Sequence, residues 1–380
     1  MNIDGTFSEE EQLIHDVFKD YLETKIVPLQ VSLRKTKEFP REIMKGISEI
    51  ALPATIPQSI GGAGMPESTI GIMSELMGMY EFPIPGFLTM HFSKFLPLIN
   101  NNENRIKYIE KYLAGELVLC GAFTEPGHGS DSAAIETKST KIGEQYVVSG
   151  EKSFVSSPIM ANAYIVTTKS GDKSGGINIL FVDSKENGIE PYSMNTMATV
   201  YRGDFGGVRF DSTKTPAGNL IGEEGTGFKN LMRVLNVQRV HVALYSIGMA
   251  EKSLSEAVEY AKSRKAFGKP ISKHQAVSFR LAESWSKLES VKLLAYKALA
   301  MQEKGLENSS ECAAVKWYGC EVALEAVSNA LQTFGAAGYV DTSPLEFRFR
   351  AARGFLIGDG TPDIQKLIIS RKLFGKDYSP

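Results

Sequence analysis

The chain has 380 residues, an apolar fraction of 43% and a formal net charge of −2. This length exceeds what one ordinary hydrophobic core accommodates, so it predicts two or three domains. A net charge so close to zero does not favour nucleic acid or an anionic membrane surface as partner, and no apolar run approaches the ~20 residues of a membrane span.

Cysteine and histidine usage also excludes some classes of protein. The cysteines Cys120, Cys312 and Cys320 form no CxxC pair, and the histidines show no metal-ligand spacing. We therefore expect no metal site, and free thiols indicate a reducing, cytoplasmic setting. The acidic N-terminus lacks a basic start followed by an apolar core, so we do not expect a signal peptide.

Residues 1–119 are predicted to form a helical domain. Apolar residues recur at helical spacing over Ser8–Leu29, and Ser8 followed by Glu11 is a capping box. Pro- and Gly-containing stretches at 53–64 and 82–86 separate the helices.

Residues 120–224 change to the pattern of a β domain. Short β-branched or aromatic runs alternate with Gly, Asn, Asp and Ser, at Tyr146–Val155, Ala163–Lys169, Ile177–Asp183 and Gly207–Asp211. The interleaved helices that a parallel sheet needs are absent. An antiparallel sheet or small barrel is therefore expected.

Residues 225–380 return to helix, with long amphipathic runs at Gly227–Arg264, Lys273–Lys304 and Ser310–Phe334. Thr361-Pro362 gives an N-cap and a first-turn proline for a last helix to about Phe374. Long helices with short connections predict an antiparallel four-helix bundle. Its wide apolar faces favour association of several copies of the chain.

The loop Cys120–Asp131, CGAFTEPGHGSD, has the residue types of a ligand-binding loop. Its glycines let a backbone approach a ligand closely. Thr124, Ser130 and Asp131 add hydroxyls and a carboxylate, which together with backbone N–H groups suit a flat polar cofactor or a phosphate. Taken alone, a polar turn between two elements is the simpler interpretation.

Six segments in sequence resemble those of the acyl-CoA dehydrogenase family. They are AFTEPGHGSD (122–131), GEKSFVSS (150–157), RVHVALYSIGMA (239–250), SRKAFGKPISKHQAV (263–277), QTFGAAGY (332–339) and GDGTPDIQKLIISR (358–371). The resemblance covers nearly the whole chain. It implies an α+β multidomain fold with an N-terminal all-α domain, a middle antiparallel β domain and a C-terminal four-helix bundle.

The same resemblance implies a biochemical role. The protein would be an FAD-dependent oxidoreductase of fatty acid metabolism, a flavoprotein that oxidises an acyl-CoA thioester. Its electrons would pass to an electron-transfer flavoprotein or a similar acceptor, and the chain would assemble as a homotetramer.

Residue roles follow from the resemblance position by position. Residues matching those that hold the flavin and its ADP half are Phe123, Thr124, Gly129, Ser130, Phe154, Ser156, Arg264, Phe267, Gln275, Gln332, Gly335 and Thr361. Residues matching the substrate side are Ser130, Asn236, Arg239 and Gly360.

The catalytic base is the point at which this sequence departs from the family. The base is normally a glutamate in an apolar pocket, where desolvation raises its pKa, but the matching residue here is Asp359. Aspartate is one methylene shorter, roughly 1.5 Å of reach, and a misplacement of about 1 Å can cost on the order of 100-fold in rate. A family subset carries its base at the position of Gln238, and glutamine cannot serve as one. Asp359 is thus the expected base.

Three interpretations of Asp359 stay open. It can be the base of an acyl-CoA dehydrogenase. The chain can instead resemble nitroalkane oxidase, a family member that uses aspartate here against a smaller carbon acid and has an arginine near the position of Lys366. Finally, Asp359 can be a solvated carboxylate near a helix start, in a flavin-binding scaffold with little dehydrogenase activity.

Overall fold

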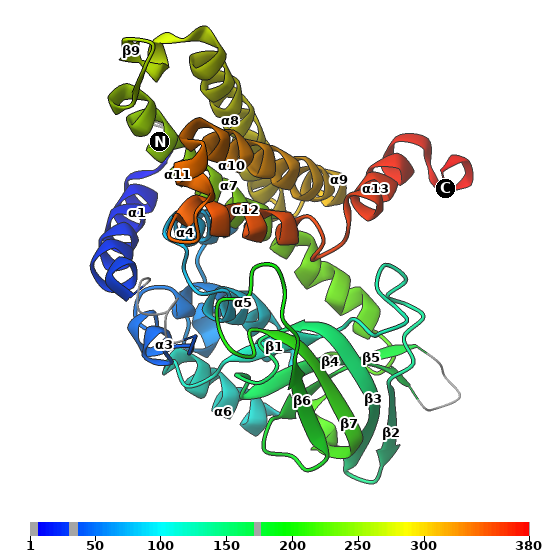
Figure 1. The fold of residues 1–380 in the computed structure, drawn as a ribbon. Helices are drawn as coiled ribbons and strands as arrows, with labels where there is room; N and C mark the ends of the chain where they lie inside the picture. Colours follow the sequence, from blue (N-terminus) through cyan, green and yellow to red (C-terminus); the bar gives the residue numbers. More distant parts are fainter. Residues whose placement is uncertain (1–6, 30–36, 171–175, 380) are drawn as a thin grey trace. The chain divides into compact units, whose positions relative to one another are not determined.

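The computed structural model describes residues 7–29, 37–170 and 176–379. The chain divides into two compact units that each gather distant stretches of sequence. The first unit contains Met1–Pro28, Pro66–Phe82 and Asn236–Pro380, and the second contains Leu29–Met65 and Pro83–Leu235. The helices and strands of each unit are labelled in Figure 1.

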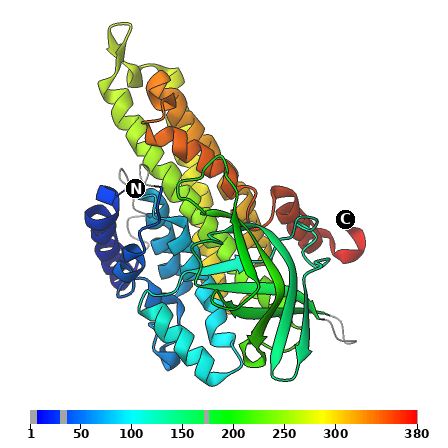
Figure 2. The same ribbon diagram turned by 60° about the horizontal axis from the view of Figure 1, so that its bottom comes forward.

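The first unit is helical. Its elements are α1 (Glu9–Tyr21) with a π turn at Leu22–Ile26, α4 (Glu67–Met79), most of α7 (Gly227–Ser263), α8 (Gln275–Glu303), α9 (Ser309–Ala314) with a π turn at Val315–Gly319, α10 (Cys320–Phe334), α11 (Ala336–Tyr339), α12 (Pro344–Phe355) and α13 (Pro362–Phe374). The hairpin of β8 (Lys265–Ala266) and β9 (Lys269–Pro270) joins α7 to α8. Figures 1 and 2 show α8 and α10 side by side, with the hairpin standing out at one end.

Close helix contacts and apolar stripes form the core of this unit. A Cβ added to Gly78 of α4 would overlap the Tyr245 carbonyl of α7, and one added to Gly248 would overlap the Glu75 carbonyl. The two helices therefore pack backbone against backbone at these glycines. Val240, Ala243, Leu244 and Ile247 of α7 recur at helical spacing, and all four are buried in the core cluster shared with α8 and α10.

The second unit contains a curled sheet with helices beside it. The helices are α3 (Glu42–Gly46), α5 (Ile84–Phe92) and α6 (Asn102–Leu113). The strands are β1 (Leu119–Ala122), β2 (Lys138–Ile142), β3 (Gln145–Ser156), β4 (Ala163–Ser170), β5 (Ile177–Asp183), β6 (Ile189–Ser193) and β7 (Phe205–Pro216). The sheet order is β1-β4-β2-β3-β7-β6, and β5 pairs with β4.

The predicted order of helical region, β region and helical region is confirmed, and the capping box of Ser8 and Glu11 is present at the start of α1. The sheet is mainly antiparallel, as expected, but β4 runs parallel to both β1 and β2. The third long helix predicted in the bundle is interrupted by the π turn at Val315–Gly319. None of the described helices is long and apolar enough to cross a membrane.

Candidate functional site

The loop after β1 is held by contacts at its start, and its backbone faces open space at Gly129. The Phe123 ring meets the rings of Phe92 and Phe95, with centroids 5.8 and 6.3 Å apart. The Thr124 carbonyl accepts a hydrogen bond from the Ser153 N–H of β3 at 2.9 Å. Beyond them, a Cβ built on Gly129 would meet no atom within 4 Å, so the backbone there faces open space. Phe123, Thr124, Gly129 and Ser130 thus lie on one anchored loop.

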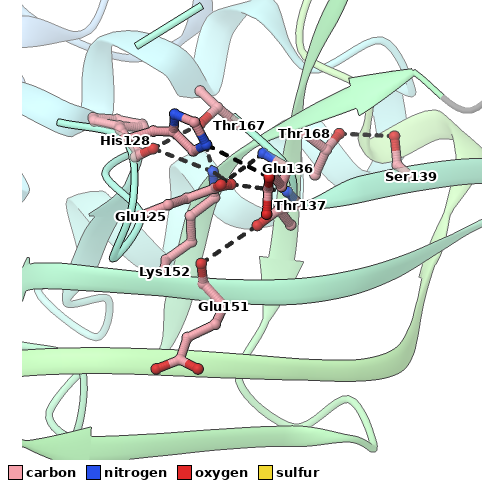
Figure 3. A network of polar contacts seen from close by, with 10 residues as sticks. Glu125, His128, Glu136, Thr137, Ser139, Glu151, Lys152, Thr167 and Thr168 are labelled. Atoms are coloured by element: carbon pink, nitrogen blue, oxygen red, sulfur yellow. Dashed lines mark hydrogen bonds and ion pairs between the residues drawn. The ribbon is translucent and has the colours of Figure 1, made fainter. Parts of the chain in front are cut away.

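A buried ion pair anchors this loop to the sheet (Figure 3). The Lys152 ammonium lies 2.8 Å from the Glu125 carboxylate, with exposed side-chain fractions of 0% and 4%. Glu125 also accepts hydrogen bonds from the Glu136 and Thr137 N–H groups at 2.6 and 2.9 Å. Lys152 in turn donates to the Phe123 carbonyl at 3.2 Å.

The ion pair is retained at neutral pH. Burial opposes ionisation of Glu125, but its hydrogen bonds from Lys152, Thr137 and the backbone outweigh burial and lower its pKa to about 2. Burial lowers the pKa of Lys152 to about 8, against the opposing effect of Glu125. Both groups therefore carry their charges near pH 7.

Phe154 and Ser156 lie at the end of β3, beside a bulge. The pairing of β3 with β7 shifts register between Ser153 and Val155, and Phe154 has a positive φ of 57°. This strained backbone presents a large aromatic ring that is 56% exposed. An exposed ring next to the anchored loop suits a flat ligand.

The residues predicted for the ADP half of the cofactor gather at one end of the helical bundle. Tyr260 near the end of α7 stacks on Phe334 at the end of α10, with ring centroids 4.1 Å apart. Arg264 directly follows α7, and Gln332 and Gly335 lie at the end of α10.

The hairpin beyond Arg264 carries an unusual aromatic residue. Phe267 has a positive φ of 51° and is 95% exposed. A strained backbone at an exposed aromatic side chain supports the hypothesis that Phe267 has a role in binding. Gln275, the first residue of α8, is also exposed.

Asp359 lies in the segment between α12 and α13 and has a positive φ of 54°. The Gln238 carboxamide donates to its carboxylate, with Nε2 at 3.4 Å from both Oδ1 and Oδ2. The backbone carbonyl of Asp359 accepts from Arg239 Nε at 3.3 Å and from Gln365 Nε2 at 3.1 Å. Desolvation raises the pKa of Asp359, and the charges of Lys316 and Arg239 and the Gln238 hydrogen bond oppose that rise.

Three buried amide oxygens on α7 and α13 lack donors among the described residues. The side-chain oxygens of Asn236, Gln238 and Gln365 are buried and accept no hydrogen bond from a described residue. Asn236 Nδ2 donates to Asn308 at 3.0 Å, so only its oxygen is left over. Buried acceptors without donors are costly and are common where a ligand completes the site.

The structure gives the surroundings of two residues whose expected roles stay predictions. Arg239, expected on the substrate side, is 7% exposed and has its Nε hydrogen-bonded to the backbone of Asp359. Thr361 is the N-cap of α13, as expected, but its side chain makes no capping hydrogen bond. Sequence reasoning missed Glu125, Lys152, Lys316 and Gln365. Only Lys316 carried a signal, a charged side chain inside an otherwise apolar stretch (AAVKWYG); Glu125, Lys152 and Gln365 stand among other polar residues.

Comparisons with known proteins cover almost the whole chain. Residues 8–116, 120–213 and 225–374 match the family models described as acyl-CoA dehydrogenase N-terminal, middle and C-terminal domains. A 3-(aryl)acrylate reductase from Clostridium sporogenes is 32% identical over 97% of this chain and 99% of its own length. The caffeyl-CoA reductase-Etf complex subunit CarC from Acetobacterium woodii is 31% identical over 97% and 100%.

Solved structures agree with the sequence matches. The crystal structure of an acyl-CoA dehydrogenase from Geobacillus kaustophilus superimposes with a TM-score of 0.91 at 28% identity, covering 97% of this chain and 99% of that one. The chain therefore belongs to the acyl-CoA dehydrogenase family, whose members are FAD-dependent oxidoreductases acting on CH–CH groups.

Proposed function

We propose that this protein catalyses the α,β-dehydrogenation of an acyl-CoA thioester, with Asp359 as the base that removes the α-proton. The observation that carries this proposal is the environment of Asp359. Its carboxylate is half-buried, has a raised pKa, and is met by the amide of Gln238. A carboxylate whose pKa moves toward working pH is a better acceptor for a weakly acidic C–H proton.

The residues present fit FAD. The anchored loop with Thr124, Gly129 and Ser130, together with the exposed Phe154 and Ser156 at the end of β3, would hold the flavin. Arg264, Phe267, Gln275, Gln332 and Gly335 would hold its ADP half, through charge-assisted bonds to the pyrophosphate and contact with the adenine. FAD, when bound, supplies the acceptor for the β-hydrogen, which leaves as hydride.

The remaining roles concern the substrate. Ser130, Asn236 and Gly360 would contact the CoA thioester, and the donorless oxygen of Asn236 is available to a ligand N–H or O–H. Arg239 would act through its bond to the Asp359 backbone as well as by its charge. We also propose that the domain boundaries follow residues 119 and 224, and that the chain assembles as a homotetramer.

The names of two relatives favour a second candidate, the same chemistry in reverse. Both the 3-(aryl)acrylate reductase and the caffeyl-CoA reductase subunit are named for reducing a conjugated double bond. In that direction a protonated Asp359 would deliver the proton to the α-carbon. The name of the second relative also supports an electron-transfer flavoprotein as the redox partner.

Asp359→Asn tests the base, with Asp363→Asn on the exposed first turn of α13 as a matched control. The measurement is anaerobic flavin bleaching by acyl-CoAs of varied chain length, and reoxidation of reduced enzyme by arylacrylyl thioesters. Asp359→Asn should keep FAD and lose flavin reduction by more than about 100-fold, while the control stays at the parent rate. Equal rates in the parent and Asp359→Asn would remove Asp359 from the mechanism.

Nitroalkanes belong in the same panel of substrates. If a small nitroalkane bleaches the flavin and no thioester does, the proposed reaction would be oxidation of a small carbon acid instead of thioester dehydrogenation. A protein that binds FAD but is bleached by neither class would be a flavin-binding scaffold.

A further inference from the structure

Lys316 is a buried cation that the proposed reaction does not use directly. It lies in the π turn at Val315–Gly319 and is 1% exposed. Its Nζ donates to the Phe355 carbonyl at 2.6 Å and lies 3.5 Å from the Gly360 carbonyl. Phe355 is the last residue of α12, so the ammonium lies at the negative end of that helix.

The two carbonyls that Lys316 binds bracket Asp359 along the chain. Gln365 of α13, which is fully buried, binds the same segment through its Nε2, at 3.1 Å from the Asp359 carbonyl and 3.0 Å from the Gly360 carbonyl. Arg239 of α7 reaches the Asp359 carbonyl at 3.3 Å. Lys316, Gln365 and Arg239, from three different elements, thus hydrogen-bond to the backbone of residues 355–360. The carboxylate of Asp359 accepts its hydrogen bonds from Gln238.

Such an arrangement answers a local conformational problem. Asp359 has a φ of 54°, a left-handed conformation that costs of order 1–3 kcal/mol for a residue other than glycine. Flexible glycines, Gly358 and Gly360, flank it. Hydrogen bonds to the carbonyls of this segment restrict its backbone to one conformation. They thereby also fix the direction of the Asp359 carboxylate.

The charges around the carboxylate are also identified. From α7 it faces Gln238 and Arg239, and from the turn and start of α10 it faces Lys316 and the buried thiol of Cys320. Gln365 on α13 is neutral. The two cations therefore supply the positive charge near Asp359, and Lys316 is the larger contribution of the two.

We propose that Lys316 is the positioning residue of the base: it fixes the backbone segment that carries Asp359 and supplies a buried positive charge near its carboxylate. This inference rests on the proposed function for its catalytic meaning, but its electrostatic content can be measured without turnover.

Lys316→Met keeps the length of the side chain and removes the charge. Lys316 opposes the rise in the pKa of Asp359, so its loss should raise that pKa further. The acid limb of flavin reduction against pH should then move to higher pH, with the rate recovering at alkaline pH. Lys316→Arg restores the charge and should return the acid limb of the pH profile toward that of the parent protein. Lys372→Met, which removes a surface lysine from α13, is the matched control and should leave the limb in place.

Thermal stability gives a readout that does not require catalysis. Desolvation raises the pKa of folded Asp359 above its unfolded value, so its stabilising contribution is complete at low pH and is lost as pH rises through the folded pKa. The difference in melting temperature between a protein and its Asp359→Asn variant should fall across that range. In the Lys316→Met background this fall should occur at higher pH.

The outcomes separate the two ideas. If Asp359→Asn does not slow flavin reduction but the stability difference still shifts with Lys316→Met, the proposed function fails and the pairing of Lys316 with Asp359 stands. A Lys316→Met variant that is slower by the same factor at every pH, with no shift in the stability difference, would make Lys316 a packing residue only and overturn the inference.

Discussion

The buried pair of Glu125 and Lys152 makes a quantitative prediction for the candidate flavin loop. Lys152→Met removes the ammonium and leaves a carboxylate that is 4% exposed and keeps its bonds from Glu136 and Thr137 but has no countercharge from Lys152. Breaking a buried ion pair by removing one partner costs about 3–5 kcal/mol. The Phe123 carbonyl also loses its bond from Lys152, so the start of the loop should loosen.

Amide hydrogen exchange measures this effect at the groups concerned. The Glu136 and Thr137 amides donate to Glu125, and a local loss of about 3 kcal/mol would speed their exchange by roughly 100-fold. Guanidinium unfolding followed by circular dichroism should show the same loss. The variant should also release FAD more readily, because Thr124 and Ser130 follow the loosened anchor.

Two further variants complete the measurement. Glu125→Gln combined with Lys152→Met should cost less than the sum of the single changes, because the double variant leaves no buried charge alone. Arg209→Met breaks a more exposed pair on the same sheet, with Glu151 at 3.2 Å, and should cost about 0–1 kcal/mol. Exchange at residues 136 and 137 that is unchanged in Lys152→Met would refute the reasoning.

Three other predictions concern the cofactor, the pH range and the base. Purified protein should release FAD on denaturation, and Arg264→Ala should lower FAD retention without changing the melting temperature of the apoprotein, because this side chain is exposed; equal retention would remove Arg264 from the site. The hydrogen-bonded Glu125 has a depressed pKa, so its contribution to stability is present above its unfolded pKa of about 4.5 and is lost as pH falls toward about 2; Glu125→Gln should flatten the acid limb of melting temperature against pH. Asp359→Glu should preserve or raise acyl-CoA oxidation if the site is a dehydrogenase with a short base, and a fall in activity with thioesters would instead favour a pocket shaped around aspartate.

Much of the helical architecture could be predicted because its signals are local. The capping box at Ser8 and the Thr361-Pro362 start of α13 depend on neighbouring residues, and the structure has both helix starts where expected. The strand β5 occupies the predicted Ile177–Asp183, since a buried strand leaves a mostly apolar run, interrupted here at Asn178.

The missed elements have weaker local signals. The strand β2 reads KSTKI and is mostly exposed, so neither alternation nor apolar content marks it. Its parallel pairing with β4, like that of β1, depends on contacts between distant segments, which no short pattern encodes. The π turn at Val315–Gly319 interrupts a sequence whose helical periodicity continues on both sides.

In the candidate site too, some features could be predicted from local motifs and others depend on the fold. Asp359, Phe154 and Phe267 were identified by their place in motifs, but the motifs do not show that all three have positive φ. Glu125 and Lys152 are far apart in sequence, and only the fold places their charged groups 2.8 Å apart in a buried environment. Resemblance thus supplied candidate positions for ligand contact, which stay predictions, whereas it did not indicate the residues that support them in the fold.

Three of the left-handed residues other than glycine, Phe154, Phe267 and Asp359, share a physical explanation that connects fold to function. An aromatic or an acidic residue with φ near 55° is unfavourable on its own, and it persists only where the surroundings fix the backbone. At Phe154 the surroundings are the bulge between β3 and β7, at Phe267 the tight hairpin with Ile271 N–H bonded to the Arg264 carbonyl at 2.8 Å, and at Asp359 the donors from Gln365 and Arg239. Glycine would relieve the strain at each position but would remove the side chain to which the proposed site assigns a role. Substituting glycine should therefore leave the fold intact or slightly stabilise it while lowering activity, the opposite of what a purely structural role for these residues would give.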